Sequence, residues 1–497
     1  VNANALILTH QYLVKVAALA NVFRTYGIEV YLTARFSAPI ELGRLATADP
    51  LDPAVIDWWQ AKVDEIYKLI PDFGGFVVKA NSEGQPGPHE YGRSHADGAN
   101  MLAQALAPHG GLSIWRAFVY SHEDAEDRHK QAYSELVPLD GTFEANTFLQ
   151  VKNGAIDFQP REPYHPLFGA MPKTPLMLEV QITQEYLGQG THLAYLAPMF
   201  KETLDAETGC AGAGSTVARI IDGTLDGHSL SGIAGVSNIG DDRNWCGHPF
   251  AAANWYAFGR LAWDHSLSAE QIADEWLRMT FSNQTAFVEP AKAMMMSSRE
   301  AVVDYMTPLG LHHLMEAHHH YGPAPWIDYG RADWQSIYYH CADADGIGCD
   351  RTSTGTNAIS QYCPPFRDLV ANVQTCPENL LLWFHHVRWD RRLKSGRTLW
   401  NELCFRYNNG VESVRAMQAT WESLEKFLYA PHFEHVKALL KIQEKDAIWW
   451  RDACLLYFQT FSKLPIPPEV EQPEHTLEYY KSIKRYYVPG IPENRFP

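Results

Sequence analysis

Short apolar runs rich in β-branched residues alternate with longer stretches of helical periodicity over the first half of this 497-residue chain. This pattern is typical of strands and helices that follow one another, with the strands forming a parallel sheet. Six strands are predicted, at residues 28–34, 75–79, 112–118, 147–152, 176–182 and 232–237. Helices are predicted between them, for example at residues 11–26, 53–69 and 96–107.

The succession favours an α/β fold, namely a (β/α)₈ TIM barrel in residues 1–250. Such a barrel has eight strands, and a barrel opened by two strands would leave parallel edges unpaired. We therefore expect the barrel to be incomplete at the N-terminus, with strands 3–8 present and two strands preceding Val1. The alternative is a doubly wound open sheet, but the glycine-rich phosphate turn that usually follows its first strand is absent here.

The strand pattern fades after Asn244, and the second half of the chain is predicted to be mainly helical. Apolar residues recur at helical spacing from Leu399 to Leu428, and again over residues 433–458. We expect residues 251–497 to form a helical domain whose apolar stripes face a core or a second subunit. Residues 322–356, rich in Gly, Pro, Asp and Tyr, predict long loops that border the active site.

Charge restricts the partners of the protein. The chain has 41 Lys and Arg against 58 Asp and Glu, a formal net charge of −17, which argues against a nucleic acid or an anionic membrane surface. We expect no membrane span, because no apolar run reaches about 18 residues. The chain opens on Val1 without a recognisable signal peptide, so the sequence assigns no compartment. Whether Cys341 and Cys349 form a disulfide is also left open by their spacing.

The chemistry of a barrel enzyme collects in the loops that follow its strands. Three of these loops carry the carboxylates Glu83, Asp157 and Glu185. Cationic side chains lie beside the same strand ends, at Lys79, Arg116 and Lys152. Any one such acid could equally cap a helix or pair with a base. Together they favour a glycosidase site, since glycoside hydrolysis uses one protonated carboxylic acid and one carboxylate.

Four segments at these positions carry a family resemblance. They are residues 79–88 (KANSEGQPGP), 152–154 (KNG), 157–159 (DFQ) and 181–186 (QITQEY). They resemble the active-site blocks of glycoside hydrolase family 67, the α-glucuronidases. The similarity continues through residues 235–240 (GVSNIG) and the helical C-terminus, and so covers essentially the whole chain. Members of that family carry an additional N-terminal domain and the first two barrel strands.

The resemblance implies hydrolysis of the α-1,2 bond between glucuronic acid, or its 4-O-methyl ether, and the terminal xylose of a xylooligosaccharide. It implies that Glu83 is the general acid and that Asp157 and Glu185 activate the attacking water in an inverting mechanism. The residues that it places around the uronate carboxylate are Lys79, Arg116 and Lys152. It also implies that Trp334 packs on the sugar, that Val1 lies near the 4-O-methyl pocket, and that the C-terminal helices form a homodimer.

Three alternatives remain at this point: a barrel glycosidase for another uronoside, a catalytically silent carbohydrate-binding protein, and a metal-dependent barrel hydrolase. We expect neither a metal nor a cofactor. The run His318, His319 and His320 lacks metal-ligand spacing, because consecutive side chains point in different directions, and is interpreted as a polar loop. Release of free uronic acid, insensitive to a chelator, would separate the leading hypothesis from the second and third alternatives.

Overall fold

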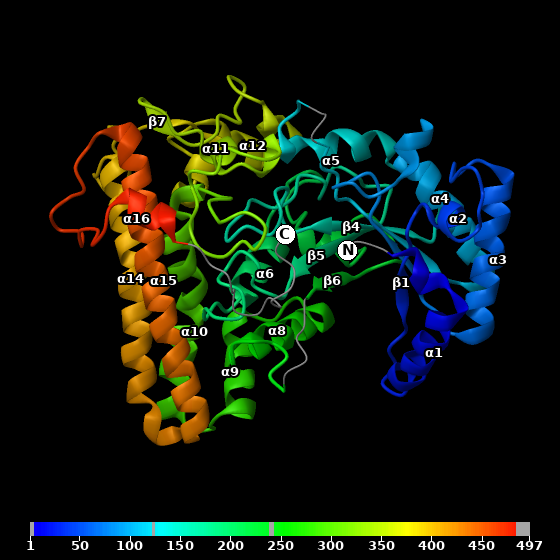
Figure 1. Cartoon of the computed structure of the whole chain (residues 1–497), viewed down its shortest axis with the longest axis horizontal. Coiled ribbons are helices and arrows are strands. Elements are labelled where there is room, and N and C mark those ends of the chain that lie inside the picture. The colour runs from blue at the N-terminus through cyan, green and yellow to red at the C-terminus, as the bar shows by residue number, and fades with distance from the viewer. Residues whose placement is uncertain (1–3, 122–124, 238–242, 484–497) are drawn as a thin grey trace. The chain divides into compact units, whose positions relative to one another are not determined.

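The computed structural model describes residues 4–121, 125–237 and 243–483 (Figure 1). Val1 and part of the 235–240 segment lie outside the described residues. The chain forms two compact units, and each unit consists of three segments that are not contiguous in the sequence. The first unit contains Val1–Ala155, His165–Glu179 and Cys210–Ala234. The second contains Ile156–Tyr164, Val180–Gly209 and Gly235–Pro497.

A six-stranded sheet forms where the strands were predicted. Its strands are β1 (Tyr31–Thr33), β2 (Gly75–Val78), β3 (Leu112–Arg116), β4 (Thr147–Lys152), β5 (Leu176–Gln181) and β6 (Ile233–Val236). They lie side by side in chain order, and the pairings from β1 to β5 are parallel. This order never reverses, which excludes the doubly wound alternative. The α/β fold class is therefore confirmed, as a parallel barrel sheet of six strands followed by a helical region.

The central strands of the sheet, β2 to β5, are largely buried on both faces. All six residues of β4 are buried, as expected for a parallel strand without a solvent face. At the start of β2, Gly75 has a φ of 135°, and a Cβ there would lie 2.0 Å from the carbonyl oxygen of Leu112. Only glycine fits this close approach of β2 to β3.

The helices of the first unit begin where capping residues stand. They are α1 (His10–Arg24), α2 (Ala38–Glu41), α3 (Pro53–Leu69), α4 (His95–Leu106), α5 (Arg128–Leu136) and α7 (Val217–Ile221). Asp52 accepts the backbone N–H of Ala54 at the start of α3. Ser94 and Asp97 form a reciprocal capping box at the start of α4. These local signals explain why the predicted and observed helices agree closely.

The second unit is mainly helical, as predicted. Its helices are α6 (Ala197–Leu204), α8 (Ala251–Trp263), α9 (Ala269–Thr280), α10 (Thr285–Met306), α11 (Ser336–His340), α12 (Pro364–Ala371), α13 (Leu381–Phe384), α14 (Leu399–Ser423), α15 (Ala430–Ser462) and α16 (Leu477–Ser482). The long helices α10, α14 and α15 lie side by side (Figure 1). A Cβ on Gly410 would come within 2.5 Å of the Tyr305 nitrogen, so α14 crosses α10 closely.

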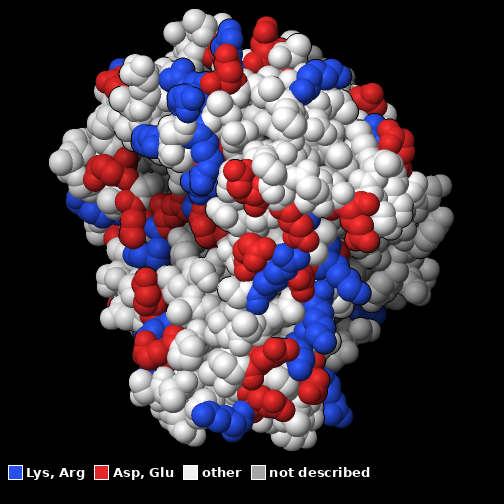
Figure 2. All heavy atoms as spheres, turned by 90° about the vertical axis from the view of Figure 1, so that its left-hand side faces the viewer, with Lys and Arg blue, Asp and Glu red and all other residues white. Residues whose placement is uncertain are grey.

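The apolar stripe of α14 faces the interior of the chain. Leu403, Tyr407, Val411 and Trp421 are all buried. The outer surface of these helices is charged instead, and Arg415 of α14 reaches Glu444 of α15 at 2.8 Å. Basic and acidic side chains lie intermixed on the face of the molecule that Figure 2 shows. The stripe is therefore explained by packing within one chain.

The segment predicted as long loops is largely irregular. It contains only a 3₁₀ turn (Ala332–Trp334), α11 and the two-residue strand β7 (Gly346–Ile347), which pairs antiparallel with β8 (Val387–Arg388). The sulfur atoms of Cys341 and Cys349 are 3.4 Å apart, as two thiols and not as a disulfide. In the described part of the chain, no helix combines the length and apolar character required to cross a membrane.

Candidate active site

The three predicted cations gather around one aromatic ring in the first unit. Lys79 follows β2 directly, and Arg116 and Lys152 end β3 and β4. Their charged groups lie 4.9, 5.2 and 3.4 Å from the ring centroid of Phe118. All three side chains are almost completely buried. Parallel strands end at the same edge of a sheet, and this edge concentrates positive charge in a chain that is acidic overall.

A buried acid that the sequence did not single out shares this cluster. Glu179 of β5 is fully buried, and its carboxylate accepts from Arg116 Nη2 at 2.5 Å and from Arg116 Nε at 3.2 Å. Gln150 Nε2 donates to the same carboxylate at 2.7 Å. Burial raises the pKa of Glu179, but the charges of Arg116 and Lys152 outweigh it, so the pKa lies below its ordinary value. The cluster therefore contains a permanent carboxylate.

Glu83 stands on a rigid loop after β2. Lys79 Nζ donates to its carboxylate at 2.5 Å. Asn81 and Glu83 both have positive φ, at 49° and 48°, and the Asn81 side chain accepts the backbone N–H of His89 at 3.1 Å. A Cβ on Gly87 would lie 2.1 Å from that same side-chain oxygen. The glycine is thus needed for the turn that presents Glu83.

Asp157 belongs to the second unit and lies in a strained loop. Its φ is 128° and that of Phe158 is 56°, values that L residues rarely adopt. The carboxylate of Glu162, which is largely buried, holds this backbone. It accepts N–H groups from Ile156 at 2.7 Å, Asp157 at 3.1 Å and Gln159 at 2.8 Å. Such strain persists only where the surroundings fix it, and it is concentrated at functional sites.

Ion pairs anchor the same loop to helices of the second unit. Arg299 of α10 donates to the carbonyl of Pro160 at 3.0 Å. Arg161 donates twice to Glu300 of α10, at 2.9 Å each, and once to Glu202 of α6 at 3.2 Å. The segment that carries Asp157 is therefore fastened to α6 and α10 at the two residues that precede Glu162.

The third candidate carboxylate, Glu185, is bound through both of its oxygens. Gln181 Nε2 donates to Oε2 at 2.8 Å, and His320 Nδ1 lies 2.9 Å from Oε1. The residue next to Glu185 contacts the other candidate base, since the Tyr186 hydroxyl donates to Asp157 Oδ2 at 2.8 Å. The structure thus brings the surroundings of Asp157 and Glu185 together within one unit.

Trp334 lies on the 3₁₀ turn of the long loop segment, with 42% of its surface exposed. The Arg331 guanidinium lies over its ring at 4.6 Å and is held there by two hydrogen bonds to Asp333, at 3.0 and 2.7 Å. An exposed and oriented indole is suited to stacking on a pyranose ring, and the contact of Trp334 with a sugar stays a prediction.

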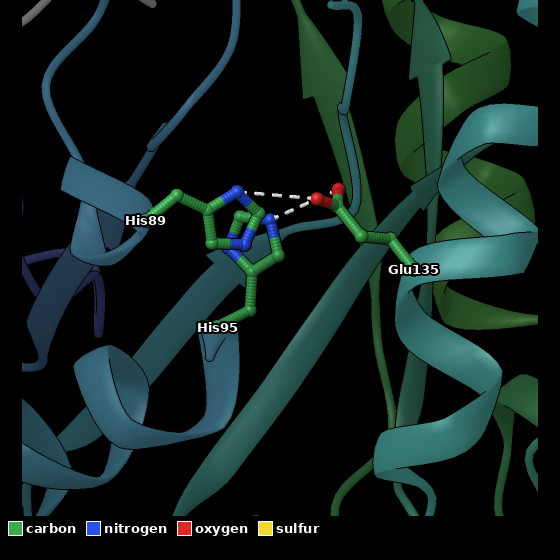
Figure 3. A group of neighbouring side chains, drawn as sticks. All are labelled: His89, His95 and Glu135. Carbon is green, nitrogen blue, oxygen red and sulfur yellow. Dashed lines mark hydrogen bonds and ion pairs between the residues drawn. The ribbon is translucent and has the colours of Figure 1, made fainter. Parts of the chain in front are cut away.

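One group of side chains in the first unit has the composition of a metal site. Its members are His89, His95 and Glu135, with ligand atoms within 4.8 Å of one another (Figure 3). Trp115 Nε1 donates to His95 Nδ1 at 3.1 Å. The proton of a neutral His95 therefore sits on Nε2, which faces Glu135 Oε2 at 3.3 Å. A histidine that binds a metal donates its other ring nitrogen to an acceptor, and Trp115 offers the opposite polarity. The group fits a hydrogen-bonded cluster better than a metal site.

Comparison with known proteins identifies the family. The sequence profile described as Glycosyl hydrolase family 67 middle domain matches residues 1–245, and that described as Glycosyl hydrolase family 67 C-terminus matches residues 246–471. The chain belongs to glycosyl hydrolase family 67. The sequence resemblance is therefore confirmed over nearly all of the chain.

Several curated relatives of the chain are named alpha-glucuronidases. The chain is 43% identical to alpha-glucuronidase A of Emericella nidulans over 94% of its own length and 56% of the relative. It is 39% identical to an alpha-glucuronidase of Hypocrea jecorina, over 94% of its length and 55% of the relative. It thus spans a little more than half the length of these relatives.

Four residues that contact the candidate groups were not predicted from the sequence, namely Glu162, Glu179, Tyr186 and His320. A local signal existed for Glu179, an acid inside an apolar strand, and for Tyr186, which adjoins Glu185. For Glu162 and His320 the signal is tertiary, because their partners are backbone amides of a folded loop and a carboxylate 135 positions away. The interpretation of the His318 to His320 run as a plain polar loop was incomplete for this reason.

Proposed function

We propose that this protein is an α-glucuronidase that releases glucuronic acid, or its 4-O-methyl ether, from the terminal xylose of xylooligosaccharides. The observation that carries the proposal is the cluster of Lys79, Arg116 and Lys152 around Phe118, beside Glu83. A net charge of −17 repels anions in general, so buried cations at strand ends are suited to a specific anionic group. Family membership and the names of the relatives support the same chemistry.

In this proposal the three cations bind the carboxylate of the uronic acid. The Glu179 carboxylate already accepts hydrogen bonds from two nitrogens of the Arg116 guanidinium and fixes its plane. A guanidinium has five donors, so it can serve a second carboxylate in addition to Glu179.

Glu83 is proposed as the general acid that protonates the departing xylose oxygen. Its carboxylate accepts a hydrogen bond from the Lys79 ammonium. A general acid must carry a proton itself, and an ammonium can only donate. We propose that the uronate draws Lys79 toward itself on binding, which leaves Glu83 to take up a proton. A neutral glucoside has no carboxylate to attract Lys79. The movement of Lys79 from Glu83 to the sugar would therefore link uronate recognition to acid catalysis.

Asp157 and Glu185 are proposed as the pair that orients and deprotonates the attacking water. An inverting glycosidase places water between a carboxylate and the sugar, whereas a retaining one attacks with the carboxylate itself. Two carboxylates whose oxygens are already oriented by hydrogen bonds are better suited to hold a water than to form an ester. The α-linked sugar should then be released first as the β-anomer.

Proton NMR of the freshly released sugar tests this mechanism. We expect the β-anomer to appear first and the α-anomer to grow in by mutarotation. An initial α-anomer, or a covalent sugar adduct on Asp157 or Glu185, would contradict it. The substrate class is tested by comparing a uronoside with the matching neutral glucoside; equal rates would contradict uronate recognition. Arg116→Lys should lower the uronoside rate although it keeps the charge, because one ammonium cannot replace two parallel hydrogen bonds.

Three further features belong to this proposal. Trp334 would stack on the bound sugar, and residues 322–356 would border the site. The division into a barrel at residues 1–250 and a helical domain at residues 251–497 is likewise proposed, with the loops contributed by the second part. Loss of saccharide affinity in Trp334→Ala, with an unchanged melting temperature, is the expected result.

We also propose a two-fold homodimer formed through the C-terminal helices. The apolar stripe of α14 does not support it, because those side chains are buried within the chain; the support is the family resemblance. Exposed apolar side chains remain nearby, including Tyr429 and Ile442, which are 71% and 40% exposed. Light scattering of the full-length protein at micromolar concentration should give twice the monomer mass, and a monomer mass would refute the dimer.

A further inference from the structure

Two stacked rings link the two candidate bases. Tyr186 and His320 lie with ring centroids 4.8 Å apart and an interplanar angle of 24°. The polar atom of each ring contacts a different carboxylate, the tyrosine hydroxyl Asp157 at 2.8 Å and His320 Nδ1 Glu185 at 2.9 Å. A shift of either ring would therefore change the position of both carboxylates, although Asp157 and Glu185 come from different loops.

The loop that carries His320 is tied to the loop that carries Glu185. The side-chain amide of Gln189 donates to the carbonyl of Glu185 at 3.1 Å and to the carbonyl of His319 at 2.9 Å. His320 has a φ of 54°, a strained value that needs such support. Tyr186 is almost fully buried, which restricts its ring to one orientation. These contacts hold the rings of Tyr186 and His320 in a defined arrangement.

We propose that Tyr186 and His320 act as a positioning pair that fixes Asp157 and Glu185 relative to one another. This inference rests on the proposed function, in which both carboxylates hold one attacking water. Neither ring touches substrate in this proposal. Each orients a carboxylate lone pair toward the water, and the stack keeps the two orientations in register. A misplacement of about 1 Å at such a point can lower a rate by about 100-fold.

Three substitutions in the full-length protein separate the contributions of the Tyr186 hydroxyl, the His320 ring and the His320 Nδ1 atom. Tyr186→Phe keeps the stack and removes the donor to Asp157. His320→Phe keeps an aromatic ring and removes the donor to Glu185. His320→Asn removes the ring but retains an amide donor near the position of Nδ1. We expect kcat to fall by about 10- to 100-fold in both Phe variants with KM nearly unchanged, and His320→Asn to recover part of the loss.

The chain offers a matched control for each Phe variant. The Tyr480 hydroxyl donates to the buried carboxylate of Asp452 at 2.7 Å. His109 stacks on Tyr67 at 4.2 Å and contacts the carboxylate of Asp64 at 2.8 Å. Tyr480→Phe and His109→Phe make the same chemical changes away from the candidate carboxylates. We expect their melting temperatures to drop as much as those of the site variants, with kcat unchanged.

The kinetic and structural outcomes decide the matter. A selective loss of kcat in Tyr186→Phe and His320→Phe, less than multiplicative in the double variant, would support a shared positioning role. Unchanged kcat, or an equal loss in the control variants, would overturn it. Crystal structures of the two Phe variants test it without any assay: Asp157 or Glu185 should turn or become disordered, and carboxylates that stay in place would overturn the inference. Failure of the unmodified protein to release uronic acid would instead overturn the proposed function.

Discussion

Lys152 of β4 lies directly opposite Glu179 of β5 in the register of the sheet. The pairing places a buried acid beside a buried base at the edge where the other cations end. Arg116 completes the arrangement through its two hydrogen bonds to the Glu179 carboxylate. Glu179 thus helps the cations to be buried together, because it supplies a counter-charge to Arg116 and Lys152.

Replacement of this acid should therefore destabilise the fold. In Glu179→Gln the shape is kept, but Arg116 is left buried without its counter-charge. Removal of one partner of a buried ion pair costs about 3–5 kcal/mol in the free energy of unfolding. Chemical denaturation of the full-length protein should show a loss of this size. A midpoint equal to that of the unmodified protein would mean that solvent or another group already compensates Arg116.

Glu162→Gln should lower kcat by more than its loss of folding stability explains. The amide keeps one acceptor oxygen but presents an NH₂ group where the carboxylate accepted a backbone N–H, so the Asp157 loop cannot keep its present form. We expect kcat to fall by about 10- to 100-fold. Glu402→Gln is the control, because Glu402 is a buried carboxylate of α14 that accepts from Ser395, Arg397 and Arg406. It should lower the melting temperature and leave kcat of the folded protein intact; parallel losses of kcat in the two variants would contradict the prediction.

The leaving group should distinguish the proposed acid from the proposed bases. Glu83→Ala should lower the rate on a xylooligosaccharide by about 10²- to 10⁴-fold, since the xylose oxygen needs a proton. An aryl uronoside with an acidic phenol needs little assistance and should be largely spared. Asp157→Ala and Glu185→Ala should fail on both substrates, because both require activated water. If Glu83→Ala were equally defective on both substrates, the assignment of the general acid would be wrong.

Acid should destabilise the protein through His165. Burial, with a smaller contribution from the charge of Lys152, lowers the pKa of this histidine to about 3. The unfolded chain takes up a proton near pH 6.5, whereas the native state does so only near pH 3. The stabilisation is therefore fully present above pH 6.5 and is lost as the pH falls toward 3, by up to a few kcal/mol, or about 1.4 kcal/mol per pH unit.

His165→Gln should make the free energy of unfolding depend less steeply on pH. The measurement is the free energy of unfolding at intervals between pH 7 and pH 4, with and without the substitution. His248 and His340 are also buried with pKa values lowered to about 3 and about 4, so a residual slope is expected in the variant. An unchanged slope in His165→Gln would show that the pKa of His165 is the same in the native and unfolded states.

The sequence alone determined the order of the elements and the identity of the strand-end residues. Alternation of apolar runs with helical periodicity is a local property, and so are caps such as Asp52 and Ser94. These signals were sufficient to predict six parallel strands and the helical second half. Because parallel strands end at a common edge, they also indicated that Lys79, Arg116 and Lys152 would meet.

Only the tertiary structure decided which groups those residues contact. Glu162 acts on Asp157 through backbone amides that converge only when the loop adopts positive φ angles, and no residue pattern encodes that geometry locally. His320 reaches Glu185 from a segment 135 positions away, because long-range packing brings two loops together. The apolar stripe of α14 likewise fits a core or a subunit contact equally well by pattern, and only packing against α10 and α15 assigned it to the core. Periodicity records which face of an element is apolar, whereas the partner of that face depends on contacts distant in sequence.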